Sequence, residues 1–152
     1  MVPQEPSKRH DSDSREQREA EPLIREALEK KLKCSLSHCV PEKLKKLKLN
    51  LDGYCDSYPP ICVEIFSHQG PSKTGQQRKL MQDMRKLLLV EKIIGRTCKK
   101  IIAVADEAAI SHLKKDSWKG EFCNAFGIEL QCIELRETAR QTILNAQKRQ
   151  RR

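Results

Sequence analysis

Residues 48–54 read KLNLDGY, residues 61–68 read ICVEIFSH and residues 76–86 read QQRKLMQDMRK. In the first of these stretches, Leu alternates with polar residues, which predicts a half-buried strand over Leu47–Leu51. The second stretch is almost continuously apolar, which predicts a central strand over Ile61–Ser67. The third stretch has the period of an amphipathic helix, which we expect to run from about Gly75 to Ile93. Two neighbouring strands followed by a long helix are therefore expected here.

Two carboxylates interrupt the apolar residues of the predicted strands. Asp52 ends the first strand, and Glu64 lies within the second. A carboxylate in a buried strand is unfavourable unless it is paired, protonated or bound to a metal. Because the two strands are expected to pair, we predict a divalent-metal site, with the backbone carbonyl of Ile65 as a third ligand. The alternative is that Asp52 and Gly53 form an ordinary turn and that Glu64 faces solvent at a sheet edge.

The rest of the chain predicts one domain between two polar ends. Residues 1–18 are polar and Ser-rich, which predicts a disordered tail. Helices and strands then alternate over residues 19–136, and a basic helix or tail follows over residues 137–152. This order predicts an α/β fold with three layers, α/β/α, around a mixed central sheet.

Start and stop signals place the other elements of that domain. The first helix is expected from Ala20 or Glu21, with Pro22 in its first turn. Further strands are predicted near Ile101–Val104 and Ile128–Leu135. Between them, Asp106 and Ser117 are expected to begin two helices as N-caps.

Charge and length limit the classes of function. The chain has 30 Lys and Arg against 21 Asp and Glu, a net charge of +9, which favours a nucleic acid as partner. A soluble surface with basic ends is the alternative. Aromatic residues make up only 4% of the chain, which argues against single-strand binding by base stacking. No apolar run approaches the roughly 20 residues that cross a bilayer, and no signal sequence is visible, so we expect a cytoplasmic protein.

Cysteine usage agrees with a reducing compartment. The 7 Cys residues include no CxxC pair and are expected to be free thiols. Zinc binding by Cys34, His38, Cys39 and Cys55 is an alternative, although their spacing matches no common zinc motif.

The placement of Asp52 and Glu64 resembles the PD-(D/E)xK nuclease superfamily, whose members share the restriction-endonuclease-like fold. The resemblance covers roughly Glu21 to Leu135, because the order of elements matches as well. It implies that Asp52 and Glu64 bind Mg²⁺ or Mn²⁺ together with a glutamate of the first helix, either Glu21 or Glu29. The superfamily's catalytic lysine, two positions after the strand glutamate, is replaced here by Phe66.

Some members of the superfamily carry this lysine on the following helix instead. The resemblance then implies that Lys79 is catalytic, with support from its helical stripe and from the loop before the helix. Gln76, Asp83 and Lys86 share that stripe, and Lys73 and His68 are the candidates for contacts with nucleic acid. The alternative is a solvated helix face on which Lys79 and Asp83 form an i,i+4 pair.

The function implied by the resemblance is metal-dependent cleavage of phosphodiester bonds, in DNA rather than RNA. Duplex DNA is then the expected partner, and a homodimer is a common assembly among such domains. Phe66 leaves a second interpretation open, which is a non-catalytic nucleic-acid-binding or assembly module that kept the nuclease fold. A basic protein-interaction domain is the third interpretation.

Overall fold

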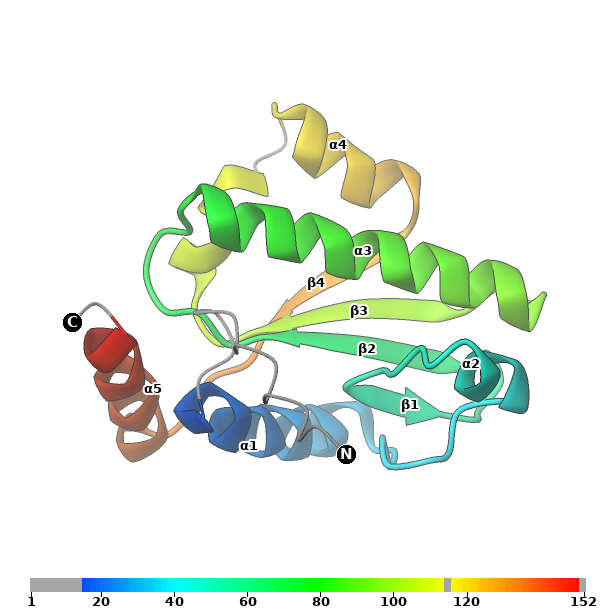
Figure 1. The fold of residues 1–152 in the computed structure, drawn as a ribbon, viewed down its shortest axis with the longest axis horizontal. Helices are drawn as coiled ribbons and strands as arrows, with labels where there is room; N and C mark the ends of the chain where they lie inside the picture. The colour runs from blue at the N-terminus through cyan, green and yellow to red at the C-terminus, as the bar shows by residue number, and fades with distance from the viewer. Residues whose placement is uncertain (1–14, 114–115, 151–152) are drawn as a thin grey trace, which may run out of the picture.

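A four-stranded mixed sheet forms the centre of the protein (Figure 1). The structure is a computed structural model of the 152-residue chain and describes residues 15–113 and 116–150. β1 pairs antiparallel with β2, whereas β2, β3 and β4 are parallel to one another. The predicted α/β class with a mixed sheet is therefore confirmed. The strands, in spatial order, are β1 (Gly53–Cys55), β2 (Ile61–Phe66), β3 (Lys99–Val104) and β4 (Ile128–Cys132).

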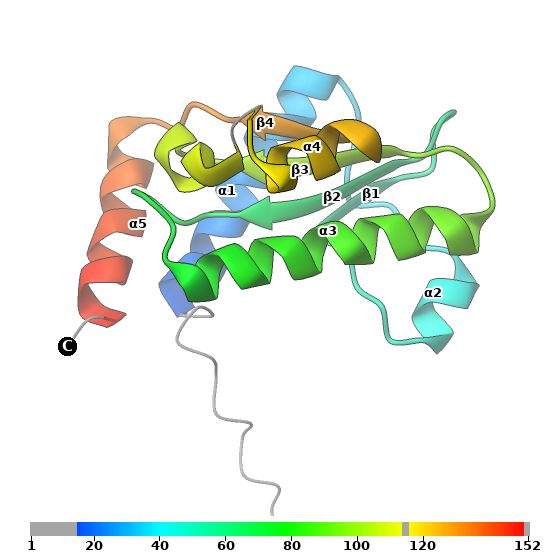
Figure 2. The same ribbon diagram turned by 90° about the horizontal axis from the view of Figure 1, so that it is seen from above.

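Helices cover both faces of this sheet (Figures 1 and 2). On one face lie α1 (Arg15–Leu32) and α5 (Glu137–Gln150), which contact each other. On the other lie α3 (Thr74–Ile94) and α4 (Trp118–Ala125). The short helix α2 (Glu42–Lys46) packs against α3, and a 3₁₀ segment, η1 (Glu107–Leu113), follows β3.

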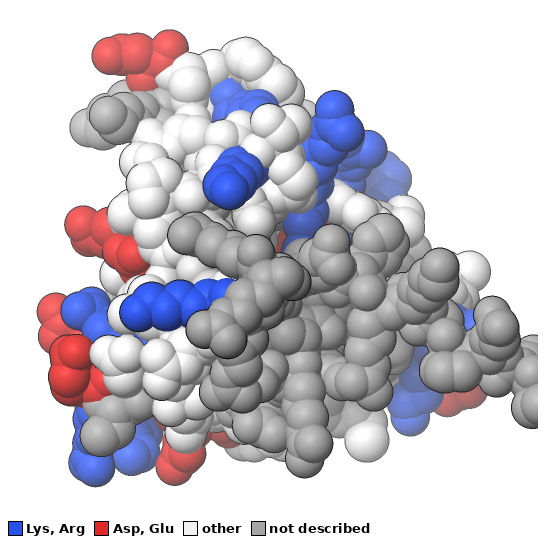
Figure 3. Space-filling view, turned by 60° about the vertical axis from the view of Figure 1, so that its left-hand side comes forward, with Lys and Arg blue, Asp and Glu red and all other residues white. Residues whose placement is uncertain are grey.

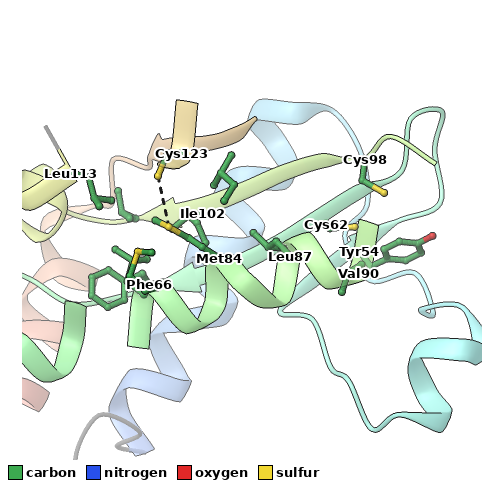
Figure 4. Packing of buried hydrophobic residues seen from close by; sticks show 14 of the residues in the cluster. Tyr54, Cys62, Phe66, Met84, Leu87, Val90, Cys98, Ile102, Leu113 and Cys123 are labelled. Carbon is green, nitrogen blue, oxygen red and sulfur yellow. Dashed lines mark hydrogen bonds between the residues drawn. The ribbon is translucent and has the colours of Figure 1, made fainter. Parts of the chain in front are cut away.

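Strand alternation divides the core into two parts. Cys62 and Phe66 of β2 pack beneath α3, where Met84 and Leu87 are fully buried (Figure 4). Val63 and Ile65 point to the opposite face and belong to the cluster that includes residues of α1. Because successive side chains of a strand alternate between faces, Glu64 points toward α3.

The first strand is displaced from its predicted position. Leu47–Leu51 is a loop in the structure, and β1 begins at Gly53, within the stretch expected to be a turn. A Cβ atom on Gly53 would lie 3.2 Å from Cβ of Leu36 and 3.3 Å from Cβ of Val63, so the residue fits closely between neighbours. The Leu–polar alternation was misleading because Leu49 and Leu51 pack against the core from a loop, which produces the same alternation as a strand.

Other boundaries differ by smaller amounts. α1 begins at Arg15, so Pro22 lies inside the helix rather than in its first turn. The tail expected to be disordered lies, over residues 1–14, outside the described part of the chain. Gly95 ends α3 with a φ of 75°. The Oγ atom of Ser117 accepts a hydrogen bond from the Gly120 amide at 3.0 Å, as predicted for an N-cap. None of the helices in the described residues is long and apolar enough to span a membrane.

A pair of leucines tests where the strand lies. Leu44 is 0% exposed and Leu47 is 61% exposed. Leu44→Ala should lower the free energy of unfolding by about 2–5 kcal/mol, since it empties a core position, whereas Leu47→Ala should change it by less than about 0.5 kcal/mol. Urea unfolding monitored by circular dichroism measures both values. If Leu47→Ala lowered the free energy of unfolding greatly and Leu44→Ala lowered it little, the strand predicted at Leu47–Leu51 would be supported instead.

Candidate functional site

Asp52 and Glu64 face each other across the first two strands. Gly53 pairs with Val63 in the β1–β2 register, so continuing the register by one residue places Asp52 opposite Glu64. Opposed side chains on antiparallel neighbours lie on the same face of a sheet, here the face beneath α3. The Asp52 carboxyl is close enough to Glu64 to raise the pKa of Glu64. The structure thus brings together the two carboxylates that the sequence singled out.

Asp52 is held from two directions. Its Oδ2 atom accepts a hydrogen bond from the backbone N–H of Ile65 at 2.8 Å. Its backbone carbonyl accepts one from Nη1 of Arg25, on α1, at 3.3 Å. Ile65 therefore meets the carboxylate pair through its amide, whereas the sequence analysis assigned a role to its carbonyl. Arg25 was not predicted; its only signal in the sequence is its spacing of one helical turn from Glu21 and from Glu29.

Glu64 is buried against a lysine. The residue is 3% exposed, and its Oε1 atom lies 2.5 Å from Nζ of Lys86 on α3. Among the described residues, Oε1 is buried and accepts no hydrogen bond of good geometry, so its close polar contact is Nζ of Lys86. Burial raises the pKa of Glu64 to about 10, aided by the hydrogen bond and negative charge of Asp52 and opposed by Lys86. At neutral pH this raised pKa therefore favours the protonated form of Glu64.

Asp83 is the third carboxylate of the cluster. Burial raises its pKa to about 6, with a further upward contribution from Asp52, while Lys79 and Lys86 lower it. We call Asp52, Glu64 and Asp83 the carboxylate cluster. Lys86 rather than Lys79 is the lysine that meets Glu64. The reason is position along the helix, since seven residues of α-helix separate the two lysines by about 10 Å.

The remaining candidates on α3 and the preceding loop are arranged differently from expectation. Gln76 accepts a hydrogen bond from the Lys73 amide at 2.8 Å and so stabilises the first turn of α3 rather than the cluster. Lys73 is exposed. His68 is 7% exposed, with Nε2 at 3.2 Å from the Pro71 carbonyl oxygen, so its ring is enclosed by the loop. Phe66 belongs to the core, which explains why no lysine is accommodated there.

The two candidate glutamates of α1, Glu21 and Glu29, lie in different surroundings. Glu29 accepts a hydrogen bond from the Leu36 amide at 3.0 Å and fixes the loop after α1. Glu21 is half-buried and lies one turn before Arg25, the residue that reaches Asp52.

The donor atoms of the cluster suit a hard cation. Two opposed carboxylates with a third nearby offer the oxygen ligands that Mg²⁺ and Mn²⁺ accept, with water completing the shell. Within residues 15–113 and 116–150, no three His, Cys, Asp or Glu side chains already converge as a metal-binding group. The zinc alternative is disfavoured too, because His38 Nδ1 accepts a hydrogen bond from the Asp56 amide at 2.9 Å.

Similarity to other proteins does not inform the assignment. Comparison with models of known protein families, with curated protein sequences and with solved structures found no match.

A groove of about 630 Å³ lies between α1 and α5, lined in part by Leu23, Ala27 and Leu135, and none of the carboxylate cluster lines it. The groove and the carboxylate cluster are therefore separate features of the surface.

The shifted pKa of Glu64 makes stability depend on pH. Above pH 4.5 the unfolded chain releases a proton that folded Glu64 retains up to about pH 10, so stability falls as pH rises through this interval. The slope from this one group is at most about 1.4 kcal/mol per pH unit. Asp83 acts in the same direction, only up to about pH 6.

Glu64→Gln keeps the shape of the side chain and removes this titration. Urea unfolding without divalent ions, between about pH 5 and pH 9, should give a flatter profile for Glu64→Gln than for the parent. Exposed Glu121 supplies the control, because Glu121→Gln makes the same substitution outside the cluster. Parallel profiles for the parent and Glu64→Gln would show that Glu64 titrates normally.

Proposed function

We propose that this chain has a restriction-endonuclease-like core of the PD-(D/E)xK type and hydrolyses phosphodiester bonds in nucleic acid with bound Mg²⁺ or Mn²⁺. The observation that carries the proposal is the opposed pair of Asp52 and Glu64, with the Lys86 ammonium at 2.5 Å from Glu64. Two carboxylates and a lysine around one point at a sheet edge are the groups that such chemistry uses.

Each residue has a distinct role in this proposal. Asp52 and Glu64 would hold the cation, which polarises the phosphodiester and lowers the pKa of a bound water. Lys86 would orient the attacking water or neutralise charge that develops on the phosphate. Asp83 and Arg25 are positioning residues, because Asp83 interacts with Lys86 and Arg25 holds the backbone of Asp52.

Lys86 takes the role that the sequence analysis gave to Lys79. With Phe66 committed to the core, a lysine must come from outside β2, and α3 passes directly over Glu64. Lys79 remains close enough to lower the pKa of Asp83 and would act on substrate charge rather than on the carboxylate pair. The preference for DNA over RNA rests only on the resemblance to the PD-(D/E)xK superfamily. The net charge of +9 is compatible with binding to either nucleic acid.

One observation favours the non-catalytic alternative. The ammonium of Lys86 already lies beside Glu64, with Nζ at 2.5 Å from Oε1. If a cation cannot displace that contact, the chain is a nucleic-acid-binding or assembly module that kept the fold. The two functions differ in whether Mn²⁺ binds and whether phosphodiester bonds break.

Mn²⁺ binding is the first test. A cation that binds only the folded state adds about 2.7 kcal/mol of stability at a concentration of 100 Kd. The thermal midpoint of the parent should rise with Mn²⁺, and more strongly at higher pH, because Glu64 must release its proton to bind. Glu64→Gln should abolish the rise, whereas the Glu121→Gln control should keep it. Equal stabilisation of the parent and Glu64→Gln would remove the carboxylate pair as the metal site.

Cleavage by lysine variants is the second test. With Mn²⁺ and duplex DNA, Lys86→Ala should reduce the rate of cleavage by about 10²-fold or more, because it removes a positioned cation from the reacting centre. Lys79→Ala is the matched control on the same helix and should lose far less. The opposite order would return the catalytic role to Lys79. Absence of cleavage in a parent that binds Mn²⁺ would establish the non-catalytic module.

A further inference from the structure

The side of α3 that faces away from the sheet is basic along its length. Arg78, Arg85 and Lys92 recur every seven residues and are all exposed, together with Gln82 and Leu89. No acidic residue lies in this outer stripe of α3. The two acidic residues of the helix are engaged elsewhere, Asp83 in the carboxylate cluster and Glu91 with Lys100 at 2.6 Å.

Helix α2 extends this basic surface. Lys43, Lys45 and Lys46 are exposed, and Glu42 is the one acidic residue of the helix. Leu44 is buried in the same core cluster as Leu87 and Val90 of α3. This contact fixes α2 beside α3, as Figures 1 and 2 both show. The lysines of α2 therefore have a defined position relative to the outer stripe.

The basic surface leads to the carboxylate cluster. Each residue of a helix is rotated by about 100° from the one before it, so Lys79 and Lys86 lie next to the outer stripe on the side of Asp83. Passing around α3, one therefore meets the outer stripe, then these two lysines, and then the cluster. In Figure 3, Lys and Arg side chains gather at the upper right of the view.

The form of this surface suits a regular polyanion. From Arg78 to Lys92 the helix rises about 21 Å, and a duplex carries about one negative charge for every 1.7 Å of its axis. Cations fixed on a helix at regular intervals can contact successive phosphates without reading base edges. A membrane-binding face would interleave large apolar residues among the cations, whereas the outer stripe has only Leu89.

We propose that the outer stripe of α3 and the lysines of α2 bind the phosphate backbone of duplex nucleic acid. The backbone then passes Lys79 and Lys86 and presents a phosphodiester to the carboxylate cluster. This last step rests on the proposed function, whereas the binding itself does not. Specificity for base sequence is not expected from these contacts, because they involve phosphates alone.

Two triple variants test the surface against a control of equal charge. The first is Arg78→Gln, Arg85→Gln and Lys92→Gln, and the second is Lys43→Gln, Lys45→Gln and Lys46→Gln. The control is Lys30→Gln, Lys31→Gln and Lys33→Gln, three exposed residues at and just beyond the end of α1. Every position is exposed, so folding should persist, and circular dichroism with thermal melting checks that it does.

Binding is measured by fluorescence anisotropy of a labelled duplex over a series of NaCl concentrations, with EDTA present. Each lost phosphate contact should reduce the slope of log K against log salt by about 0.9, so each test variant should lose up to about 3 from the slope of the parent. The control should retain nearly the whole slope. An equal loss in all three variants would show that net charge alone drives binding and would overturn the proposal.

Two further measurements distinguish this proposal from the proposed nuclease function and from binding to anionic membranes. Test variants that lose duplex binding should keep the Mn²⁺-dependent rise in thermal midpoint, and Glu64→Gln should keep duplex binding. If both test variants bind duplex as tightly as the parent does, the proposed phosphate-binding surface is wrong. The proposed nuclease site is unaffected by that result. Binding to anionic lipid vesicles without binding to duplex, lost in the same variants, also overturns it and assigns the surface to membranes.

Discussion

The burial of the Glu64 carboxyl opposite Asp52 is the constraint on which the candidate site depends. A carboxyl that is 3% exposed can be tolerated only with a proton, a counter-ion or both. Here the Asp52 carboxylate, a retained proton and the Lys86 ammonium meet at one point. Asp52 is held in turn by the Ile65 amide and by Arg25, so residues of β2 and of two helices on opposite faces are tied to one pair.

A half-buried glutamate elsewhere on α3 provides a comparison with Glu64. Glu91, near the end of α3, also pairs with a lysine, and its Oε2 atom accepts hydrogen bonds from Lys100 at 2.6 Å and from the Cys98 amide at 2.8 Å. Burial acts to raise the pKa of Glu91, but these contacts outweigh it and leave the pKa lowered. Glu64 has a second carboxylate as neighbour instead of a second donor, and its pKa is raised. Glu91 is therefore held in its ionised form by two donors, whereas the surroundings of Glu64 favour its protonated form.

Helix α3 connects the core, the candidate site and the basic surface. Its inner side buries Leu80, Met84 and Leu87 against the sheet. Its flank carries Asp83 and Lys86 to the cluster, and its outer side is the stripe that we propose binds phosphates. A straight helix keeps these three sides in fixed relation, because every residue advances by the same rotation and rise. Substrate position would then be coupled to the site through one rigid element.

The sequence by itself determined the class of fold, the long helix, the main buried strands and the residues of the cluster. Those features follow from local periodicity and from the unfavourable energy of a carboxylate in an apolar strand, both of which are visible in Ile61–Phe66 and in α3. It did not place β1, because the alternating leucines of Leu47–Leu51 are compatible with either a strand or a loop. Only tertiary pairing of Gly53 with Val63 distinguished them.

Tertiary structure alone decided which lysine meets Glu64. Lys79 and Lys86 occupy nearly equivalent positions around α3, so periodicity cannot choose between them, and the choice depends on where β2 crosses the helix. The same reason explains why Arg25 was missed and why Gln76 and His68 proved to stabilise loops and helix ends. Local pattern specifies the face on which a side chain lies, whereas the partner that it meets depends on contacts between segments distant in sequence.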